Sequence, residues 1–428
     1  MIFNKFYKPP ADLFGSAFPS SLQLCYNEGN LKDPLTGQGG KMTTNNQLLV
    51  DLASIEHNLS ALKAKTHGQK IFAVVKADAY GLGALSIAKR LEDQVDGFCI
   101  AVPEEAMSLI EGGIKKPLLC LSYVTHEWYP TLVRYAIRPT LFDLDSARAL
   151  NEEARRQGRR TPFHLGLDTG HSRIGMMWQD PDLMEKIKAI CQLDHLQLEG
   201  MYSHFASADE ADESYMQLQF ERFQTVANQM TRLGYPVPIR HICNDAGLLR
   251  HPEFALDAVR LGIGLYGIYP SDFVKAEFPL DLAPVFCWRT EITNVKAIEP
   301  GTPVSYNHRW RAQRESRIAT LQIGYADGYF RSLTNQSDVL ILGHRCPQVG
   351  AVCMDQMMVD VTDLEAKRKM AGQAGVAIGE KAYLIGQAPK SPCVDPPVTA
   401  DELARLIGTI PYEIMTSIAP RVSRIYLN

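Results

Sequence analysis

The chain has 428 residues, of which 46% are hydrophobic and 21% are charged, so it can bury a large core and is long enough for two domains. Its formal net charge of −4 gives no sign of a nucleic-acid partner. No run of about 18 apolar residues is present, which argues against a membrane-spanning helix. Nine cysteines are scattered without C-x-x-C spacing, and several lie inside apolar runs, which predicts reduced core residues in a cytoplasmic protein.

Residues 1–47 precede the predicted folded core and differ from it in composition. Residues 1–41 are rich in Pro, Gly, Ser and Asn and show no sustained periodicity. They lack a basic region followed by an apolar stretch, so we expect no secretory signal. Met42 begins Met-Thr-Thr-Asn-Asn just before the first strand. This position favours a leader or residues upstream of the true start, with a genuine N-terminal extension as the alternative.

From Leu48 the chain alternates between strand and helix patterns. A short strand at 48–50 leads into a helix that Ser54 is predicted to cap. Helical patterns, such as those at 146–157 and 214–233, lie between most of the later strands. Eight buried strands are expected at residues 71–75, 97–101, 117–121, 138–142, 163–167, 198–203, 239–242 and 257–260. Eight strand–helix units predict an α/β fold, a (β/α)8 TIM-type barrel, although periodicity alone leaves a doubly wound sheet open.

Residues 284–428 show a different sequence pattern. Short alternating runs at 317–323, 339–342 and 357–361 are separated by Gly, Pro and Asn, which indicates antiparallel strands. A helix is expected at 400–407, with Thr399 as its N-cap. The predicted organisation is therefore an extension at 1–47, a barrel at 48–283 and a mostly antiparallel β domain at 284–428.

The apolar strand at 71–75 ends in Lys76, just before the glycine turn at 81–83. Lys76 is therefore expected where a buried strand meets a loop. Desolvation at such a position depresses the pKa of a lysine and makes its amine usable for a Schiff base. A lone lysine there more often extends past the sheet into solvent, so the surrounding motif is needed to distinguish a Schiff-base lysine from an exposed one.

The stretch Val75-Lys76-Ala77-Asp78-Ala79-Tyr80-Gly81-Leu82-Gly83 closely resembles the cofactor-binding signature of the alanine racemases. These are barrel enzymes that hold pyridoxal 5'-phosphate (PLP) on a lysine. Further similar stretches are Asp168-Thr169-Gly170-His171-Ser172-Arg173-Ile174-Gly175, Ser203-His204-Phe205, Arg260-Leu261-Gly262-Ile263-Gly264-Leu265-Tyr266-Gly267, Ser305-Tyr306-Asn307 and Pro411-Tyr412. The resemblance favours the barrel over the doubly wound sheet. It implies a PLP-dependent racemase of fold type III that interconverts L- and D-alanine, supplying D-alanine for peptidoglycan.

The resemblance also implies a role for each candidate site residue. Racemisation removes a proton from one face of Cα and returns it to the other, so Lys76 and Tyr306 are expected to be two catalytic bases. Tyr306 is implied to come from a partner subunit, in a homodimer with shared active sites. The implied cofactor-binding residues are Lys76, Tyr80, His204, Asn244, Asp245, Arg260, Gly262, Ile263 and Tyr412. The implied substrate-binding residues are Arg173, Tyr306, Met354 and Asp355. No metal site with recognisable ligand spacing is expected.

Three departures from the family pattern bear on the substrate and the phosphate site. Gly166 stands where many members carry a carbamylated lysine beside the active-site arginine, so an anion, a water or Asp168 is expected to fill the gap. Asp245 replaces a phosphate-contacting serine, so it either turns away from the phosphate or alters its site. His171-Ser172 replaces the commoner Met-Gly pair. Serine or a broader set of amino acids is the alternative substrate. A non-catalytic PLP-binding barrel is the distant alternative, but such proteins lack the second domain.

Overall fold

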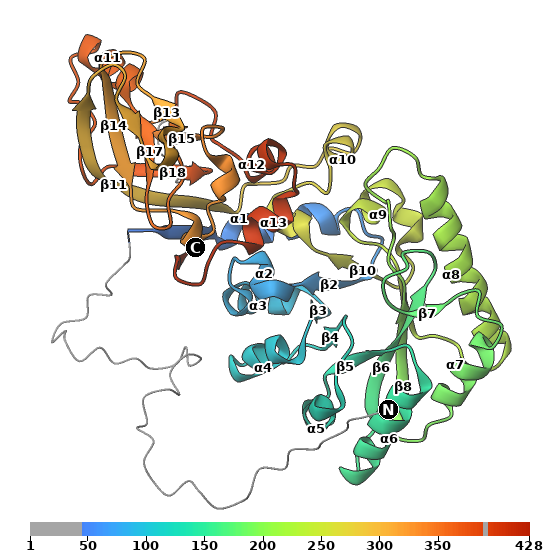
Figure 1. Ribbon diagram of the computed structural model, residues 1–428. Helices are drawn as coiled ribbons and strands as arrows, with labels where there is room; N and C mark the ends of the chain where they lie inside the picture. The colour runs from blue at the N-terminus through green and yellow to red at the C-terminus, as the bar shows by residue number, and fades with distance from the viewer. Residues whose placement is uncertain (1–44, 388–392) are drawn as a thin grey trace, which may run out of the picture. The chain divides into compact units, whose positions relative to one another are not determined.

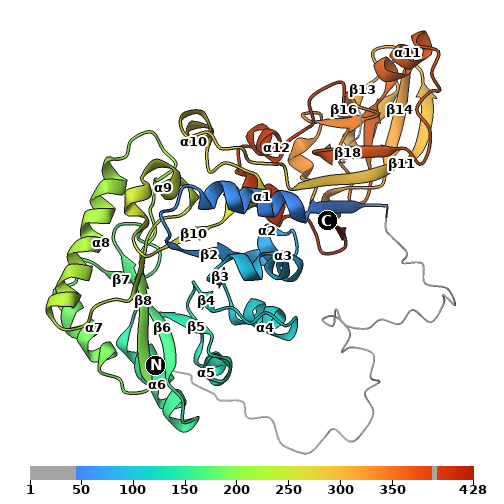
Figure 2. The same ribbon diagram turned by 180° about the vertical axis from the view of Figure 1, so that it is seen from behind.

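The computed structural model describes residues 45–387 and 393–428 (Figure 1). The expectation for residues 1–41 therefore lies outside the described residues. Parallel strands with intervening helices occupy the chain as far as residue 261, and mostly antiparallel strands follow (Figures 1 and 2). This order confirms the predicted fold class, a barrel followed by a β domain. The exact domain limits stay a prediction.

The barrel strands lie where the alternation of patterns predicts them. They follow one another in the sheet in the order β10-β2-β3-β4-β5-β6-β8-β9, and the short β7 (Met176–Met177) pairs with β6. Backbone bonds from Asp257 N to Arg240 O and from Arg260 N to Cys243 O, both 3.0 Å, join the two ends and close the ring. The strands are β2 (Lys70–Val74), β3 (Gly97–Ile100), β4 (Leu118–Cys120), β5 (Arg138–Leu141), β6 (Thr161–Asp168), β8 (Leu196–Tyr202), β9 (Ile239–His241) and β10 (Ala258–Leu261).

Helices surround these strands and bury one apolar face against them (Figures 1 and 2). In α6 the buried positions include Ala147, Leu150 and Ala154, which recur at helical spacing. The helices of this half are α1 (Leu52–Lys63), α2 (Lys76–Tyr80), α3 (Ala84–Leu91), α4 (Pro103–Glu111), α5 (Tyr129–Tyr135), α6 (Leu144–Arg156), α7 (Leu183–Cys191), α8 (Ser214–Arg232), α9 (Asp245–Arg250) and α10 (Asp272–Glu277).

The prediction that Ser54 caps the first helix is wrong. Asp51 is the N-cap of α1, and its Oδ1 accepts hydrogen bonds from Ala53 N (3.0 Å) and Ser54 N (3.2 Å). Ser54 lies in the first turn, where its hydroxyl donates to Asp51 Oδ2 at 3.0 Å. A carboxylate satisfies the free N–H groups of a helix start as well as a hydroxyl does, and the strand before α1 ends directly at this acid.

The β domain is built on an eight-stranded sheet in the order β14-β17-β16-β15-β18-β11-β1-β19, with β14 also paired to β11. Helix α12 (Ala400–Ile407) interrupts it with Thr399 as N-cap, as predicted, since the Thr399 hydroxyl accepts from Glu402 N at 3.1 Å. The other elements are β11 (Phe286–Ile298), β12 (Pro303–Val304), β13 (Trp310–Arg311), β14 (Ser316–Leu321), β15 (Asp338–Ile341), β16 (His344–Val349), β17 (Met357–Asp360), α11 (Thr362–Met370), β18 (Lys381–Ile385), α13 (Pro411–Thr416) and β19 (Ser423–Leu427).

Strand β1 (Gln47–Asp51) precedes the barrel in the chain but pairs with strands of the β domain. It runs antiparallel to β11 and parallel to β19. The buried Asn58 of α1 then links the barrel to the chain that leaves it, because Asn58 Nδ2 donates to Leu265 O (3.2 Å) and Ala283 O (2.9 Å). The two halves of the chain are thus joined by a shared sheet as well as by the connecting segment.

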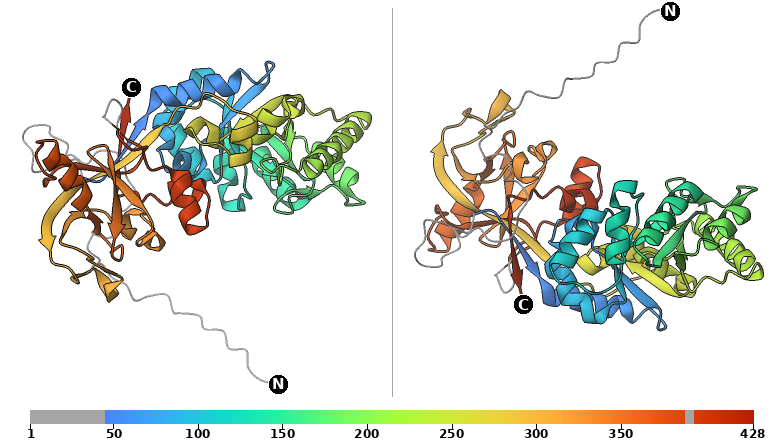
Figure 3. Two further views of the ribbon diagram at one scale, coloured as in Figure 1. Left: turned by 90° about the horizontal axis from the view of Figure 1, so that it is seen from above. Right: turned by 90° about the horizontal axis from the view of Figure 1, so that it is seen from below.

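Helix α13 lies against the turn that follows Lys76, and it is drawn in red beside the blue α2 in Figure 3. A Cβ at Gly81, where φ is +85°, would lie 2.5 Å from Met415 O. Glycine is therefore required at this position on two grounds, the left-handed backbone and the close approach of α13.

No helix within residues 45–387 and 393–428 is long and apolar enough to cross a membrane. The same residues contain no cluster of three or more His, Cys, Asp or Glu side chains that could hold a metal ion. The described cysteines, among them the buried Cys99 and Cys120, are all free thiols.

Candidate active site

A cavity of about 660 Å³ lies at the carboxyl ends of the barrel strands. This is the end of a parallel barrel at which loops can present side chains without disturbing the packed interior. The predicted site residues that line this cavity are Lys76, Tyr80, Arg173, His204, Asn244, Asp245, Arg260, Gly262, Ile263 and Tyr412. The structure thus brings together, in one cavity, most of the residues that the sequence proposes. Tyr306, Met354 and Asp355 do not line it.

Lys76 is partly buried at the edge of this cavity, one residue beyond the end of the buried strand region 71–75. Burial lowers the pKa of its ammonium group, and the nearby positive charge of Arg173 lowers it further. A lysine in this environment is more readily present as the neutral amine, the form that acts as a nucleophile or as a base.

The turn after Lys76 differs from the predicted loop. Residues Ala77, Asp78, Ala79 and Tyr80 all have φ between 51° and 57°, so they form a short left-handed helical turn without glycine. Hydrogen bonds from Ala79 N to Val75 O and from Gly81 N to Ala77 O, both 2.8 Å, hold it. Each L-residue in this conformation costs about 1–2 kcal/mol. Strain of this kind persists where the surrounding structure enforces it, often beside functional groups.

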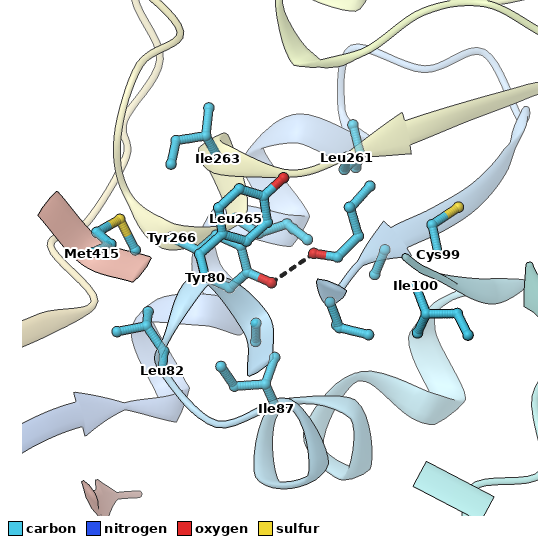
Figure 4. Close-up of a cluster of buried hydrophobic side chains, with 14 of the residues drawn as sticks. Tyr80, Leu82, Ile87, Cys99, Ile100, Leu261, Ile263, Leu265, Tyr266 and Met415 are labelled. Carbon is cyan, nitrogen blue, oxygen red and sulfur yellow. Dashed lines mark hydrogen bonds between the residues drawn. The ribbon is translucent and has the colours of Figure 1, made fainter. Parts of the chain in front are cut away.

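The backbone at 262–264 forms the other end of the cavity. Gly262 precedes η4 (Ile263–Tyr266), whose N–H groups begin a short helical turn. Figure 4 shows Ile263, Leu265 and Tyr266 packed beside Tyr80, with the Tyr266 hydroxyl donating to Val74 O at 2.7 Å. A Cβ at Gly262 would lie 2.9 Å from the Tyr80 hydroxyl, so glycine leaves room for the tyrosine beside this backbone. We call the N–H groups of residues 262–264 the backbone cradle.

Tyrosine hydroxyls surround the backbone cradle. The rings of Tyr80 and Tyr412 lie 5.8 Å apart, and those of Tyr80 and Tyr266 lie 4.9 Å apart. Burial raises the pKa of both Tyr80 and Tyr412, and the neighbouring Asp245 raises it further. These phenols therefore stay protonated and can donate hydrogen bonds to an anion.

Asp245 does not turn away from the backbone cradle. It opens α9, where the Asn244 side chain serves as N-cap by accepting from Gly247 N at 2.9 Å. The Asp245 carboxylate is buried, and its Oδ2 accepts a hydrogen bond from Gly262 N at 2.9 Å. An acid therefore occupies the N–H that a phosphate would be expected to use.

Arg260 lies on the floor of the cavity and is 4% exposed. Its guanidinium donates to the carbonyls of Ser203 (2.8 Å) and Ile242 (3.1 Å). It also contacts two imidazoles, His241 Nδ1 at 2.8 Å and His204 Nδ1 at 3.2 Å. None of these partners is an acid, so the positive charge of Arg260 remains available to a group in the cavity.

The contacts of Arg260 continue through a chain of buried side chains. His241 Nε2 lies 2.9 Å from His164 Nδ1, and His164 Nε2 lies 3.2 Å from Glu199, which also accepts from Arg138 Nε at 3.0 Å. Burial and the charge of Arg260 hold the pKa of His241 well below its usual range. Burial raises the pKa of Glu199, but hydrogen bonds from His164 and Arg138 outweigh it and lower the value to about 2. Because Arg260 can only donate, both imidazoles are then neutral: His241 donates to His164, and His164 donates to the glutamate.

His204 and His171 form a stacked pair beside the cavity, with ring centroids 5.5 Å apart and planes inclined by 22°. Burial and the charge of Arg260 keep the pKa of His204 well below its usual value. The buried Nδ1 of His171 has no hydrogen-bond partner among the described residues. This ring is therefore free to meet a polar group of a bound molecule.

Asp168 holds the turn that follows strand β6. Its Oδ1 accepts from Gly170 N (2.8 Å) and Ser172 N (3.1 Å), at the start of the loop that carries Arg173. A Cβ at Gly166 would lie 2.8 Å from the Thr140 methyl group, so the threonine fills part of the space near that glycine.

Tyr306, Met354 and Asp355 lie together in a second, more open cavity of about 1010 Å³ on the β domain. Tyr306 is 67% exposed and Met354 is 53% exposed. Ser305 has φ of 65°, and its hydroxyl donates to Ala351 O at 2.7 Å, which fixes the loop behind the tyrosine. Asp355 accepts from Arg421 Nη2 at 2.8 Å. Within one chain, Tyr306 and Lys76 thus line different cavities.

Several residues of the site were not predicted. His164, Glu199 and His241 lie inside three barrel strands, where polar residues interrupt apolar runs, and this interruption is the signal that could have found them. Arg222 and Tyr215 of α8 hold the Arg173 loop by donating to Thr169 O (2.8 Å) and Gly170 O (2.9 Å). No local pattern in the sequence indicates this long-range support.

The cavity fits a cofactor that carries an anionic end and a planar ring with a basic atom. The anionic end suits the backbone cradle and its tyrosines, and Arg260 suits an acceptor nitrogen. Lys76 supplies an amine that can bind an aldehyde covalently. The charge of Asp245 opposes an anion at the backbone cradle.

Comparisons with known proteins agree with this geometry. The alanine racemase N-terminal domain family matches residues 50–270, and the C-terminal domain family matches residues 285–426. An alanine racemase of Clostridium tetani is 40% identical over 380 residues, which is 88% of this chain and 94% of that protein. The structure of an alanine racemase from Clostridium difficile 630 superposes with a TM-score of 0.82 at 33% identity, covering 90% of this chain and 97% of that one. A histidine racemase from Leuconostoc mesenteroides superposes with a TM-score of 0.80 at 27% identity, covering 90% and 98%. The chain belongs to the alanine racemase family.

Proposed function

We propose that this protein is a PLP-dependent racemase that interconverts L- and D-alanine in the cytoplasm and so supplies D-alanine for peptidoglycan. The observation that carries the proposal is the partly buried Lys76, with a lowered pKa, in one cavity with the backbone cradle and Arg260. Family membership supports the same assignment across both domains. PLP held in this cavity would supply an electron-withdrawing ring that makes the Cα proton of an amino acid easier to remove.

The residues of the chain divide the remaining work. Lys76 and Tyr306 act on opposite faces of the substrate: one side chain removes the Cα proton while the other donates a proton, and the roles reverse for the other enantiomer. Arg173 and the Met354 backbone N–H bind the substrate carboxylate, and Asp355 supports that segment through its ion pair with Arg421. Arg260 donates to the pyridine nitrogen and keeps it unprotonated, because a guanidinium does not give up its proton.

The active protein is a homodimer with two shared active sites. Tyr306 is exposed in a cavity of its own, apart from that of Lys76, so a second subunit is the means by which the two bases would meet. The strained loop at Ser305 holds the tyrosine outward from the β domain. Such a fixed, exposed side chain suits insertion into the site of a partner.

Serine or a broader set of amino acids is the second candidate for the substrate. His171 has a buried nitrogen without a partner among the described residues, and a hydroxyl or a larger polar side chain could use it. That a histidine racemase shares this fold supports testing substrates larger than alanine.

The proposal is tested by the exchange of α-protons in D2O over a panel of D- and L-amino acids, alanine, serine and histidine included. Alanine is expected to exchange fastest. Lys76→Ala should abolish both the exchange and the absorbance of lysine-bound cofactor, whereas Lys89→Ala, at an exposed lysine of α3, should preserve both. Covalently bound PLP that persists in Lys76→Ala would refute the assignment of the lysine.

Tyr306→Phe tests the two-base arrangement. Loss of the phenol should slow proton removal from one enantiomer of alanine far more than from the other, since each base serves one face. Single-turnover exchange with each enantiomer measures the difference, and Tyr135→Phe, on the exposed surface of α5, is the control. Equal slowing in both directions would instead support a single base.

A further inference from the structure

Asp245 lies where an anion would be expected, although it is itself an anion. Its Oδ2 accepts a hydrogen bond from Gly262 N at 2.9 Å. A Cβ at Gly264 would lie only 2.8 Å from Asp245 Oδ1. The carboxylate is thus seated in the backbone cradle, which under the proposed function is the binding site for the cofactor phosphate.

The surroundings of Asp245 disfavour a charge. The side chain is 4% exposed, and its buried Oδ1 has no hydrogen-bond partner among the described residues. Burial raises the pKa of Asp245 to about 6, despite the backbone N–H groups that lower it.

The ionisable groups that face Asp245 are phenols and a second acid. Tyr80 of α2, Tyr266 of η4 and Tyr412 of α13 each have their pKa raised by burial and by the charge of Asp245. Asp209, in the loop after β8, lines the same cavity and also raises the pKa of Tyr412. Lys76, Arg173 and Arg260 line the same cavity, but none of them has a described hydrogen bond or ion pair with Asp245 that would balance a carboxylate and a phosphate together.

We propose that Asp245 binds the cofactor phosphate as the neutral acid, so that loading of PLP takes up one proton from solvent. The protonated carboxyl group has one O–H donor, which can bond to a phosphate oxygen as a serine hydroxyl would. The N–H of Gly262 then donates its hydrogen bond to the phosphate instead of to Asp245. The proton comes from water and stays on Asp245, and the phosphate keeps its own charge.

Proton uptake makes loading depend on pH. Above the pKa of Asp245, the apparent affinity for PLP should fall about tenfold for each pH unit, because one more proton is bound in the complex than in the free protein. The formation of the lysine bond and the titration of the phosphate also depend on pH. Both contributions are the same in the wild type and in variants at residue 245, so they cancel in the ratio of the two dissociation constants for PLP.

The experiment titrates PLP into the cofactor-free wild type, Asp245→Asn and Asp245→Ser between pH 6.5 and pH 8.5. Binding is followed by tryptophan fluorescence and by equilibrium dialysis, which do not require turnover. The ratio of wild-type to variant dissociation constant should rise about tenfold per pH unit. With pyridoxal, which lacks the phosphate, the same ratio should stay flat. The asparagine variant keeps the shape of the side chain and a permanent donor, so it guards against a folding defect in the serine variant.

Calorimetry gives a second readout. In buffers of different ionisation enthalpy at pH 8, the wild type should take up about one more proton per PLP bound than Asp245→Asn does. A ratio of dissociation constants that is flat for PLP, or that rises equally for pyridoxal, overturns the proposal. A separate result would refute the proposed function: if the wild type binds PLP with the predicted proton uptake but exchanges no α-protons, the racemase activity is refuted and the role of Asp245 is retained. A wild type that binds no PLP at any pH refutes both.

Discussion

Glu199 determines how the buried side chains beneath the cavity are charged. Through His164 and His241 it is connected to Arg260, and both imidazoles are aligned so that they donate toward the acid. Arg138 balances the glutamate at the far end, with both side chains half-buried. The role of Arg260 therefore depends on a residue three hydrogen bonds away, which no motif around the arginine would indicate.

Glu199→Gln should lower the free energy of unfolding by about 1.5–3 kcal/mol, the range for a hydrogen bond to a charged group. The glutamine leaves the half-buried Arg138 without a counter-charge and weakens the acceptor for His164. Urea denaturation at pH 7 measures the loss. Glu152→Gln removes an exposed pair with Arg155 and should leave the midpoint unchanged. Equal midpoints for all three proteins would show that the buried chain of hydrogen bonds does not contribute to stability.

The same glutamate predicts a pH dependence. Its pKa in the folded protein, about 2, lies below the ordinary value of 4.5, so folding favours the charged form. The stabilisation is therefore fully present above about pH 4.5 and is lost as the pH falls toward about 2. Unfolding free energies of the wild type and Glu199→Gln, measured across this window, should converge at the acidic end. A difference that is constant with pH would contradict the charge of Glu199 as its cause.

Individual elements were predictable to the extent that their cause is local. The eight barrel strands lie within a few residues of the predicted runs, because a buried strand needs continuous apolar sequence wherever it lies. The N-cap of α1 was misplaced by three residues, since Asp51 and Ser54 both carry capping oxygens and only the end of β1 decides between them. The left-handed turn after Lys76 could not be predicted, because alanine disfavours that conformation.

Ala77→Gly tests the left-handed turn. Glycine relieves about 1–2 kcal/mol of backbone strain, and its greater freedom in the unfolded chain offsets about 0.5–1 kcal/mol of that gain. The exposed Ala77 loses no packing, so we expect stability to rise by up to about 1.5 kcal/mol. Ala366→Gly, at an exposed position of the right-handed α11, should instead lower stability by about 1 kcal/mol. Equal losses in both variants would refute the strained turn.

At the scale of the whole molecule, the two cavities predict complementation between subunits. Lys76→Ala and Tyr306→Phe chains are each expected to be inactive alone, but a mixed dimer would contain one intact shared site. Random assortment of equal amounts should restore up to roughly a quarter of the wild-type activity. Racemisation is assayed after the mixed proteins are refolded together, and differently tagged chains confirm that mixed dimers form. Their complete inactivity would place the tyrosine in the site of its own subunit.

Strand β1 also constrains the order in which the protein can be made. Its two neighbours, β11 and β19, both lie far along the chain, so one edge of β1 stays unpaired until β11 is made and the other until β19 is made. Pairings between such remote segments are slow to form. Until both have paired, Gln47–Asp51 presents unsatisfied backbone groups next to a barrel whose own strands can already have closed. The nascent protein therefore keeps a strand edge open to aggregation until Ser423–Leu427 pairs with β1.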